Sequence, residues 1–256
     1  MAYKFNRNYL ILLICLLLGT SAFSRDLPIP KLMLANVYHE NINLKDYWVS
    51  EKYDGVRALW NGKQFISRGG DIYHAPEWFI KNFPKQKLDG ELWINRQSFE
   101  RVVSTVRDKT PDEEAWKAVK YMVFDLPESP LTFDSRLLRL KALVLKFDIP
   151  WLQTVKQWKV KSHQELMSQL SNITKNGAEG LMLHRASSLY KGKRSADLLK
   201  VKPYQDAEAI IIDHIVGKGK YTNYLGAVLV ETPSGIQFKI GSGFSDKERN
   251  RPPRYW

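Results

Sequence analysis

A lysine followed by an acid, a glycine and an arginine is the pattern in this chain best suited to chemistry. It lies in residues 51–57, which read Glu-Lys-Tyr-Asp-Gly-Val-Arg. The amine of a lysine can attack a phosphate only when it is neutral, whereas an ordinary lysine, with a pKa of about 10.4, is protonated at neutral pH. Burial and neighbouring positive charge both favour the neutral amine. Lys52 is therefore a candidate nucleophile, although the pattern by itself also fits a strand that ends in a turn with an exposed lysine.

Five further short motifs follow this lysine along the chain. Each is unremarkable alone: Glu91 fits the edge of a strand, Phe124 fits the core, and Asp125 fits either a site or a strand-end cap. Their order is much harder to reach by chance than any single motif, so we interpret all six as parts of one site. In chain order, the five are Ser67-Arg68-Gly69, Asp89-Gly90-Glu91-Leu92, Val123-Phe124-Asp125, Glu179-Gly180-Leu181-Met182 and Lys200-Val201-Lys202-Pro203.

Predicted strands carry these motifs at or near their ends. Asn61-Gly62 predicts a hairpin after one of the strands. Helices are expected over 98–120, with an N-terminal signal in 110–113, over 134–147, and from a capping box at Ser162 onward. The strands are expected near 48–50, 56–60, 88–94, 121–126, 181–184 and 198–201.

The pattern changes near residue 203, where strands and glycine-rich turns replace the mixture of strands and helices. Strands are expected over 207–216, 227–231 and 236–240. We therefore predict an α+β fold, with antiparallel sheets and flanking helices in a larger domain and a small β domain after it. The expected domains are residues 25–203 and residues 204–256, with the boundary in 202–206.

The N-terminus has the features of a secretory signal peptide covering residues 1–24. Lys4 and Arg7 supply positive charge without an acid, residues 10–18 form an apolar run, and small residues up to Ser24 suit a cleavage site. The apolar run is short for a membrane span, although a retained N-terminal anchor is the alternative. We therefore expect an exported protein with no stable membrane association after cleavage.

The chain carries 39 Lys and Arg against 27 Asp and Glu, which gives a formal net charge of +12. Residues 204–256 are close to neutral, with seven basic and six acidic side chains, so the excess belongs mainly to the larger domain. A surplus of this size points to nucleic acid or an anionic membrane as partner. The composition, with 44% hydrophobic residues and one cysteine, excludes a disordered chain, a collagen-like fibre and a disulfide scaffold.

Taken in order, the six motifs resemble those of the covalent nucleotidyltransferases, the superfamily of ATP-dependent DNA ligases, RNA ligases and mRNA capping enzymes. The leader, the small size and the segment 50–60 narrow the resemblance to the minimal periplasmic ATP-dependent DNA ligases of Gram-negative bacteria. It covers residues 28–250. It implies a nucleotidyltransferase (adenylation) domain over 25–203 and the start of an OB-fold β-barrel over 204–256. It also implies a periplasmic location, nicked double-stranded DNA as partner, and a monomer.

The resemblance also implies a role for individual residues. Lys52 would attack the α-phosphate of ATP to form lysyl-AMP, and the AMP would then pass to a DNA 5′-phosphate before the 3′-hydroxyl attacks. Asp54 and Glu179 would hold Mg²⁺ or Mn²⁺, hard cations that prefer carboxylate oxygens. Two residues would contact adenine, Ser50 and Phe124, the latter by stacking. Glu91 would contact the ribose, and Arg57 and Arg68 would bind ribose or phosphate, including the nick 5′-phosphate. Lys200 and Lys202 would supply positive charge beside Lys52 and the phosphates.

The C-terminal end departs from the family pattern. Residues 241–246 resemble the family, but the further strands and final basic motif that normally follow are not found, so we expect an incomplete OB-fold and weak self-adenylylation. The alternatives left open are an RNA ligase, a capping-type nucleotidyltransferase and a non-catalytic nucleic-acid-binding remnant. Stacking on Phe124 does not separate ATP from GTP, so the expected base preference depends on the resemblance.

Overall fold

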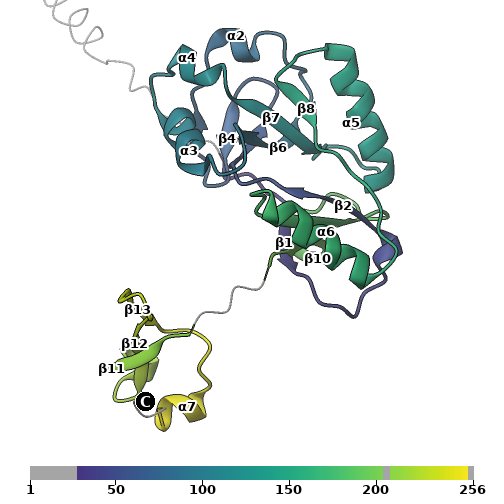
Figure 1. Cartoon of the computed structure of the whole chain (residues 1–256). Coiled ribbons are helices and arrows are strands. Elements are labelled where there is room, and N and C mark those ends of the chain that lie inside the picture. Colours follow the sequence, from purple (N-terminus) through teal and green to yellow (C-terminus); the bar gives the residue numbers. More distant parts are fainter. Residues whose placement is uncertain (1–27, 204–207, 253–256) are drawn as a thin grey trace, which may run out of the picture. The chain divides into compact units, whose positions relative to one another are not determined.

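The computed structural model of the chain describes residues 28–203 and 208–252 and divides them into two compact units, with the division between Pro203 and Tyr204 (Figure 1). The predicted signal peptide, residues 1–24, lies outside the described residues. No helix within the two described ranges has the length and apolar character needed to cross a membrane.

A six-stranded sheet forms the first layer of the larger unit. Its strands lie in the order β5 (Ile72–Tyr73), β4 (Phe65–Ser67), β3 (Val56–Trp60), β6 (Leu88–Trp93), β7 (Lys120–Asp125) and β8 (Leu152–Thr154). Every neighbouring pair is antiparallel except β7 and β8. The predicted hairpin at Asn61-Gly62 is confirmed and joins β3 to β4.

Four helices cover the apolar face of this sheet. They are α2 (Glu77–Ile80), α3 (Phe99–Arg107), α4 (Glu113–Trp116) and α5 (Phe133–Phe147). Buried side chains from each of them join the sheet in one core: Phe79, Val102, Trp116 and Leu140. The opposite face of the sheet is therefore the one left for a site.

A four-stranded sheet forms the second layer of the larger unit. Its strands lie in the order β1 (Leu34–Val37), β10 (Arg194–Val201), β9 (Gly180–Arg185) and β2 (Tyr47–Lys52). Helix α6 (His163–Lys175) packs Leu166 and Leu170 against one face, where Val49 and Leu183 are buried. The other face is again free to carry polar residues.

Strand alternation determines which side chains reach these two free faces. Successive residues of a strand point to opposite sides of its sheet. Val49, Leu181, Leu199 and Val201 are in the core with α6, so the residues beside them, Ser50, Met182 and Lys200, point the other way. Lys52 lies two residues after Ser50 on β2 and so shares its face. In the first sheet, Val56, Leu92 and Val123 are in the core, and the residues beside them, Arg57, Glu91 and Phe124, point away from it.

The segment expected to be helical, residues 98–120, contains two helices, α3 and α4, and the N-terminal signal predicted in 110–113 precedes the second. The residue that caps α4 is Asp112, near the end of that signal, which accepts hydrogen bonds from the backbone of Glu114 and Ala115. The helix expected over 134–147 is confirmed as α5, with Leu137 and Leu140 buried and Leu138 69% exposed.

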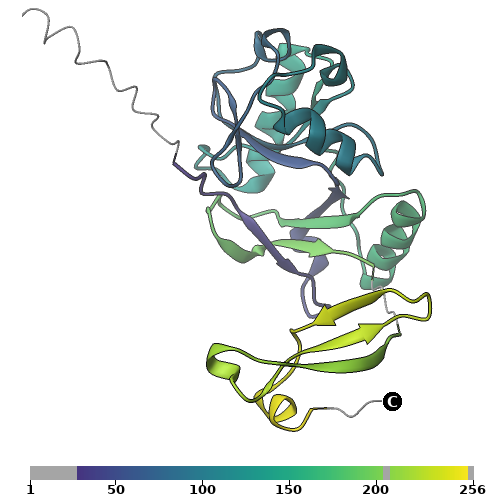
Figure 2. The same ribbon diagram turned by 90° about the vertical axis from the view of Figure 1, so that its left-hand side faces the viewer.

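The second unit is a small antiparallel sheet with one short helix. Its strands β11 (Ile210–Val216), β12 (Leu225–Glu231) and β13 (Gln237–Ile240) lie side by side in that order, as the yellow-green and yellow arrows of Figure 2 show. Helix α7 (Asp246–Asn250) carries the buried Arg249, which donates hydrogen bonds to the backbone oxygens of Leu225, Gly226 and Gly241. The three predicted strands are confirmed, and within residues 208–252 they form an open sheet.

Candidate active site

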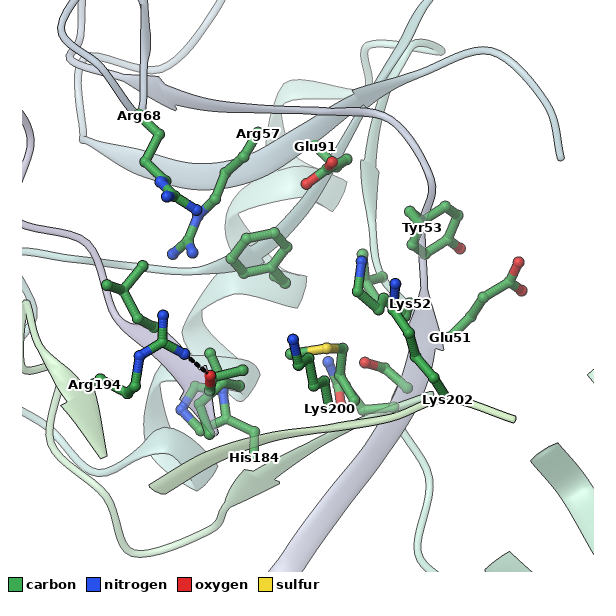
Figure 3. A pocket seen from close by; sticks show the side chains of 18 residues that line it. Glu51, Lys52, Tyr53, Arg57, Arg68, Glu91, His184, Arg194, Lys200 and Lys202 are labelled. Carbon is green, nitrogen blue, oxygen red and sulfur yellow. Dashed lines mark hydrogen bonds between the residues drawn. The ribbon is translucent and has the colours of Figure 1, made fainter. Parts of the chain in front are cut away.

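A cavity of about 380 Å³ lies between the free faces of the two sheets in the larger unit (Figure 3). It brings together eight of the ten predicted site residues, which are spread over positions 50–202 of the sequence. The two remaining residues, Asp54 and Glu179, are not in its lining but lie next to residues that are. The eight are Ser50, Lys52, Arg57, Arg68, Glu91, Phe124, Lys200 and Lys202.

Lys52 shares a carboxylate with Lys202. Its Nζ donates a hydrogen bond to Oε2 of Glu179, while Nζ of Lys202 lies 2.5 Å from Oε1 of the same residue. Partial burial acts in the opposite direction, but the hydrogen bonds from Lys202 and Lys52 lower the pKa of Glu179. The expected positive neighbour Lys202 is therefore present, and the carboxylate of Glu179, predicted as a metal ligand, lies between it and Lys52.

The predicted metal ligands Asp54 and Glu179 lie close enough to affect each other. Burial first, and then the charge of Glu179, raise the pKa of Asp54, while Lys52 and Lys202 oppose the shift. Residues 28–203 and 208–252 contain no group of three or more His, Cys, Asp or Glu side chains placed to hold a metal. Two carboxylates suit a Mg²⁺ ion that is held jointly with substrate phosphates, and do not suit a cation caged by protein alone.

Two glycines in the motifs are required by close backbone packing. A Cβ atom on Gly55 would lie 2.4 Å from the backbone oxygen of Leu92, and one on Gly90 would lie 2.7 Å from the backbone oxygen of Met122. Both distances are far below van der Waals contact. The Asp-Gly pairs of the motifs therefore let the turn after Lys52 and the β6 strand pack closely enough to bring Lys52 and Glu91 to one cavity.

Arg57 is held in place by neighbouring groups for which no role was predicted. Its Nε and Nη2 donate to the two carboxylate oxygens of Asp89 at 3.0 and 2.7 Å, and its Nη1 donates to the backbone oxygen of Met33 at 2.7 Å. Tyr190 also donates to Asp89, at 2.7 Å. The guanidinium lies 5.4 Å from the ring centroid of Phe124. Three of its five N–H groups are thus engaged, and two remain for a ligand.

Glu91 faces the cavity from β6 and is largely shielded from water. Burial raises its pKa to about 8, against the opposing effects of Lys52 and Arg57. At neutral pH the carboxyl group is therefore mostly protonated and can donate as well as accept a hydrogen bond. That property suits a contact with a sugar hydroxyl.

The role of Asp125, which the sequence left open, is structural. Both of its carboxylate oxygens accept hydrogen bonds from the buried Arg136, at 2.6 and 2.9 Å. Arg136 in turn donates to the backbone oxygens of Leu131 and Ser188. The pair ties the end of β7, and with it the neighbouring Phe124, to helix α5.

Several cavity residues were missed because no motif marks them. His184 is stacked on Phe133 with 3.6 Å between ring centroids, and burial lowers its pKa to about 3, so the imidazole is neutral. Only the strand position of His184 could have indicated that it faces the cavity, since it lies two residues after Met182 on β9. The other missed residues include Gln157 and Arg194, which line the cavity, and Tyr190, which donates a hydrogen bond to the Asp89 carboxylate that holds Arg57.

Two family models match the chain. The model described as ATP dependent DNA ligase domain matches residues 32–202, and the model described as DNA ligase OB-like domain matches residues 216–255. The first covers the unit that contains the cavity. The second covers most of the small β unit.

Comparisons with individual proteins and solved structures also find DNA ligases. The chain is 37% identical to a DNA ligase of Haemophilus influenzae over 87% of this chain and 81% of that protein. It is 29% identical to a DNA ligase of African swine fever virus over 60% of this chain, but spans only 38% of that protein. A solved structure from a study of Lig E DNA ligases, which concerns DNA binding with a minimal scaffold, shares 45% identity and a TM-score of 0.79 over 88% of each chain. The chain belongs to the ATP-dependent DNA ligase family.

Proposed function

We propose that this protein seals nicks in duplex DNA, with Lys52 as the nucleophile. The observation that carries this proposal is the position of Lys52 at a cavity that also contains Phe124, Arg57 and Lys200. A flat ring, an arginine fork and several lysines are complementary to a purine, a ribose and a chain of phosphates. No other described part of the larger unit combines these features around a lysine amine.

The reaction begins with nitrogen attack on phosphorus. The neutral amine of Lys52 attacks the α-phosphorus of ATP, a P–N bond forms, and the bond to the bridging oxygen breaks so that pyrophosphate leaves. An oxygen of the DNA 5′-phosphate then attacks the same phosphorus, which breaks the P–N bond and moves AMP to the DNA. Finally the 3′-hydroxyl attacks the DNA phosphorus and AMP leaves. Each step exchanges one bond to phosphorus for another.

The chain's own residues hold the substrate during these steps. Phe124 stacks on adenine, Glu91 binds a ribose hydroxyl, and the free N–H groups of Arg57 and those of Arg68 bind ribose or phosphate. Lys200 and Lys202 lie where they stabilise charge on the phosphates. Glu179 pairs with both Lys52 and Lys202, so a further cation bound there would compete with both amines for this carboxylate.

Mg²⁺ is the cation that best suits that role. Glu179 and Asp54 would hold it together with the phosphates, and it would supply positive charge against the leaving pyrophosphate. These two carboxylates would be the ligands that the protein supplies to the ion. This assignment extends the family membership to particular residues of this chain.

The proposed DNA partner is a nicked duplex, bound partly through the excess positive charge. Since phosphate contacts displace condensed counterions, binding should weaken steeply as salt concentration rises. We also propose that the chain is exported and acts in the periplasm. The support is the signal-like sequence of residues 1–24, and the check is whether the chain produced in a Gram-negative host is found in the periplasm without its first 24 residues or so. An uncleaved chain in the cytoplasm would overturn the location without affecting the chemistry.

The deciding experiment follows AMP. The protein is incubated with ATP labelled at the α-phosphate and Mg²⁺, and the label is followed on denatured protein and on a nicked duplex. Wild type is expected to become labelled and to seal the nick, and Lys52→Ala is expected to do neither. Lys63→Ala, which changes an exposed lysine in the β3–β4 loop, is the control and should behave as wild type. Label that stays on Lys52→Ala would overturn the assignment.

A further inference from the structure

Gln157 lies on a stretch of chain that joins the two sheets beside the cavity. On one side, Val155 N–H donates to the backbone oxygen of Val123 in β7 at 2.8 Å. On the other side, Trp158 and Val49 of β2 exchange two backbone hydrogen bonds, at 2.8 and 2.9 Å. Gln157 lies between these two anchors and lines the cavity.

The position of this stretch places Gln157 between two residues with proposed adenine contacts. Val123 is followed by Phe124, and Val49 is followed by Ser50, and both of these line the cavity. The backbone anchors therefore fix Gln157 between the strand that carries the stacking ring and the strand that leads to Lys52. A base stacked on Phe124 would have one edge directed to this side wall.

The side-chain amide of Gln157 forms no hydrogen bond with another described residue. Its Oε1 is buried and receives no hydrogen bond from any described residue. Most buried polar atoms in proteins have a partner, and leaving one without a partner costs free energy. Because no hydrogen bond fixes Oε1, the amide can turn about its last side-chain bond, which has a broad torsional preference.

We infer that Gln157 binds the amino edge of adenine, an inference that depends on the proposed function of the cavity. The amide oxygen accepts a hydrogen bond from the 6-amino group, and the amide nitrogen donates one to N1. A glutamine amide matches this pair of groups, one donor beside one acceptor. Phe124 then supplies affinity for any purine, and Gln157 supplies the contact that depends on the base.

A cycle of four measurements isolates this contact. Two proteins are tested, wild type and Gln157→Met, a variant that keeps the side-chain length. For each protein, ATP is compared with purine riboside triphosphate, which lacks only the 6-amino group. The readouts are the dissociation constant and the rate of AMP attachment at nucleotide concentrations below saturation. Wild type is expected to prefer ATP by about three- to tenfold, the range for one neutral hydrogen bond. In Gln157→Met the preference is expected to fall to about one.

Two controls make the result specific. Gln153→Met changes a glutamine on β8 that does not line the cavity and should keep the wild-type preference. In Gln157→Glu the carboxylate opposes the lone pair on N1 of adenine but accepts from N1–H of guanine, so the ratio of ATP to GTP binding is expected to fall. Thermal unfolding of each variant checks that it is folded.

The outcomes separate this inference from the proposed function. A preference for the 6-amino group that persists in Gln157→Met, or is absent in wild type, overturns the inference while AMP attachment to wild type still supports the ligase chemistry. Failure of wild type to bind either nucleotide overturns both. A preference that disappears in Gln157→Met and survives in Gln153→Met supports the inference.

Discussion

Replacing Asp89 with alanine would remove the carboxylate that holds Arg57 at the cavity. Asp89 has no exposed side-chain surface, and the Arg57 side chain is only 19% exposed. The two side chains are joined by two hydrogen bonds, and Tyr190 adds a third to the same carboxylate. After the change, the one hydrogen bond that Arg57 keeps among those found in the described residues is the bond to the backbone oxygen of Met33.

The size of the effect follows from the burial of this pair. Removing one partner of a buried ion pair costs about 3–5 kcal/mol, because the other charge is left without compensation. We expect the free energy of unfolding of the Asp89→Ala variant to fall by an amount in this range. The Arg185–Asp197 pair is the matched control, since both side chains are partly exposed, at 32% and 25%. The Asp197→Ala change should cost about 1 kcal/mol or less.

Denaturation in urea followed by tryptophan fluorescence measures both variants. Seven of the eight tryptophans precede residue 204, so the signal reports mainly on the larger unit. We also expect weaker nucleotide binding in Asp89→Ala than in Asp197→Ala, because Arg57 is no longer held beside Phe124. Equal losses of stability in the two variants would refute the view that Asp89 and Arg57 form a buried, mutually dependent pair.

Three further changes test other parts of the site. Gly90→Ala would place a methyl group 2.7 Å from the backbone oxygen of Met122, so we expect a loss of about 1–3 kcal/mol in urea denaturation, and unchanged stability would contradict the packing. Glu179→Gln is expected to raise the Mg²⁺ concentration needed for AMP attachment by about tenfold or more, and an unaltered metal titration would argue against this ligand. Since burial raises the pKa of Glu91 from 4.5 to about 8, its neutral form stabilises the fold fully below pH 4.5, and this contribution is lost as pH rises through 8. Glu91→Gln should therefore lose less stability than wild type between pH 5 and 8, as unfolding at both pH values would show.

Local features of the fold could be predicted because they depend on neighbouring residues. The hairpin at Asn61-Gly62 follows from a turn whose backbone few other residues adopt. Helix α6 begins at the predicted Ser162, whose side chain accepts a hydrogen bond from the backbone of Glu165. The start of α4 also falls within the predicted signal of residues 110–113, where Asp112 accepts hydrogen bonds from the backbone of Glu114 and Ala115.

The residues that perform the proposed chemistry were identified from the order of short motifs, and strand alternation explains why these residues share a cavity. Ser50 and Lys52 are two residues apart on β2. Lys200 lies on β10 of the same sheet, and Lys202 follows two residues later, just after that strand ends. A period of two places each pair on one face whatever the rest of the fold does.

The pairing of charges within the site could be decided only by the tertiary structure. Lys52 and Glu179 are far apart in sequence, and nothing in either motif shows that they form a hydrogen bond rather than act separately. The same is true of Asp89 and Arg57, and of the anchors that fix Gln157 beside Phe124. The types of side chain, their strand faces and the family they resemble could be read from the order of residues alone, because these depend on local spacing. Which charges neutralise one another, and which polar atom is left without a partner, depend on distances between strands that only the packed sheets set.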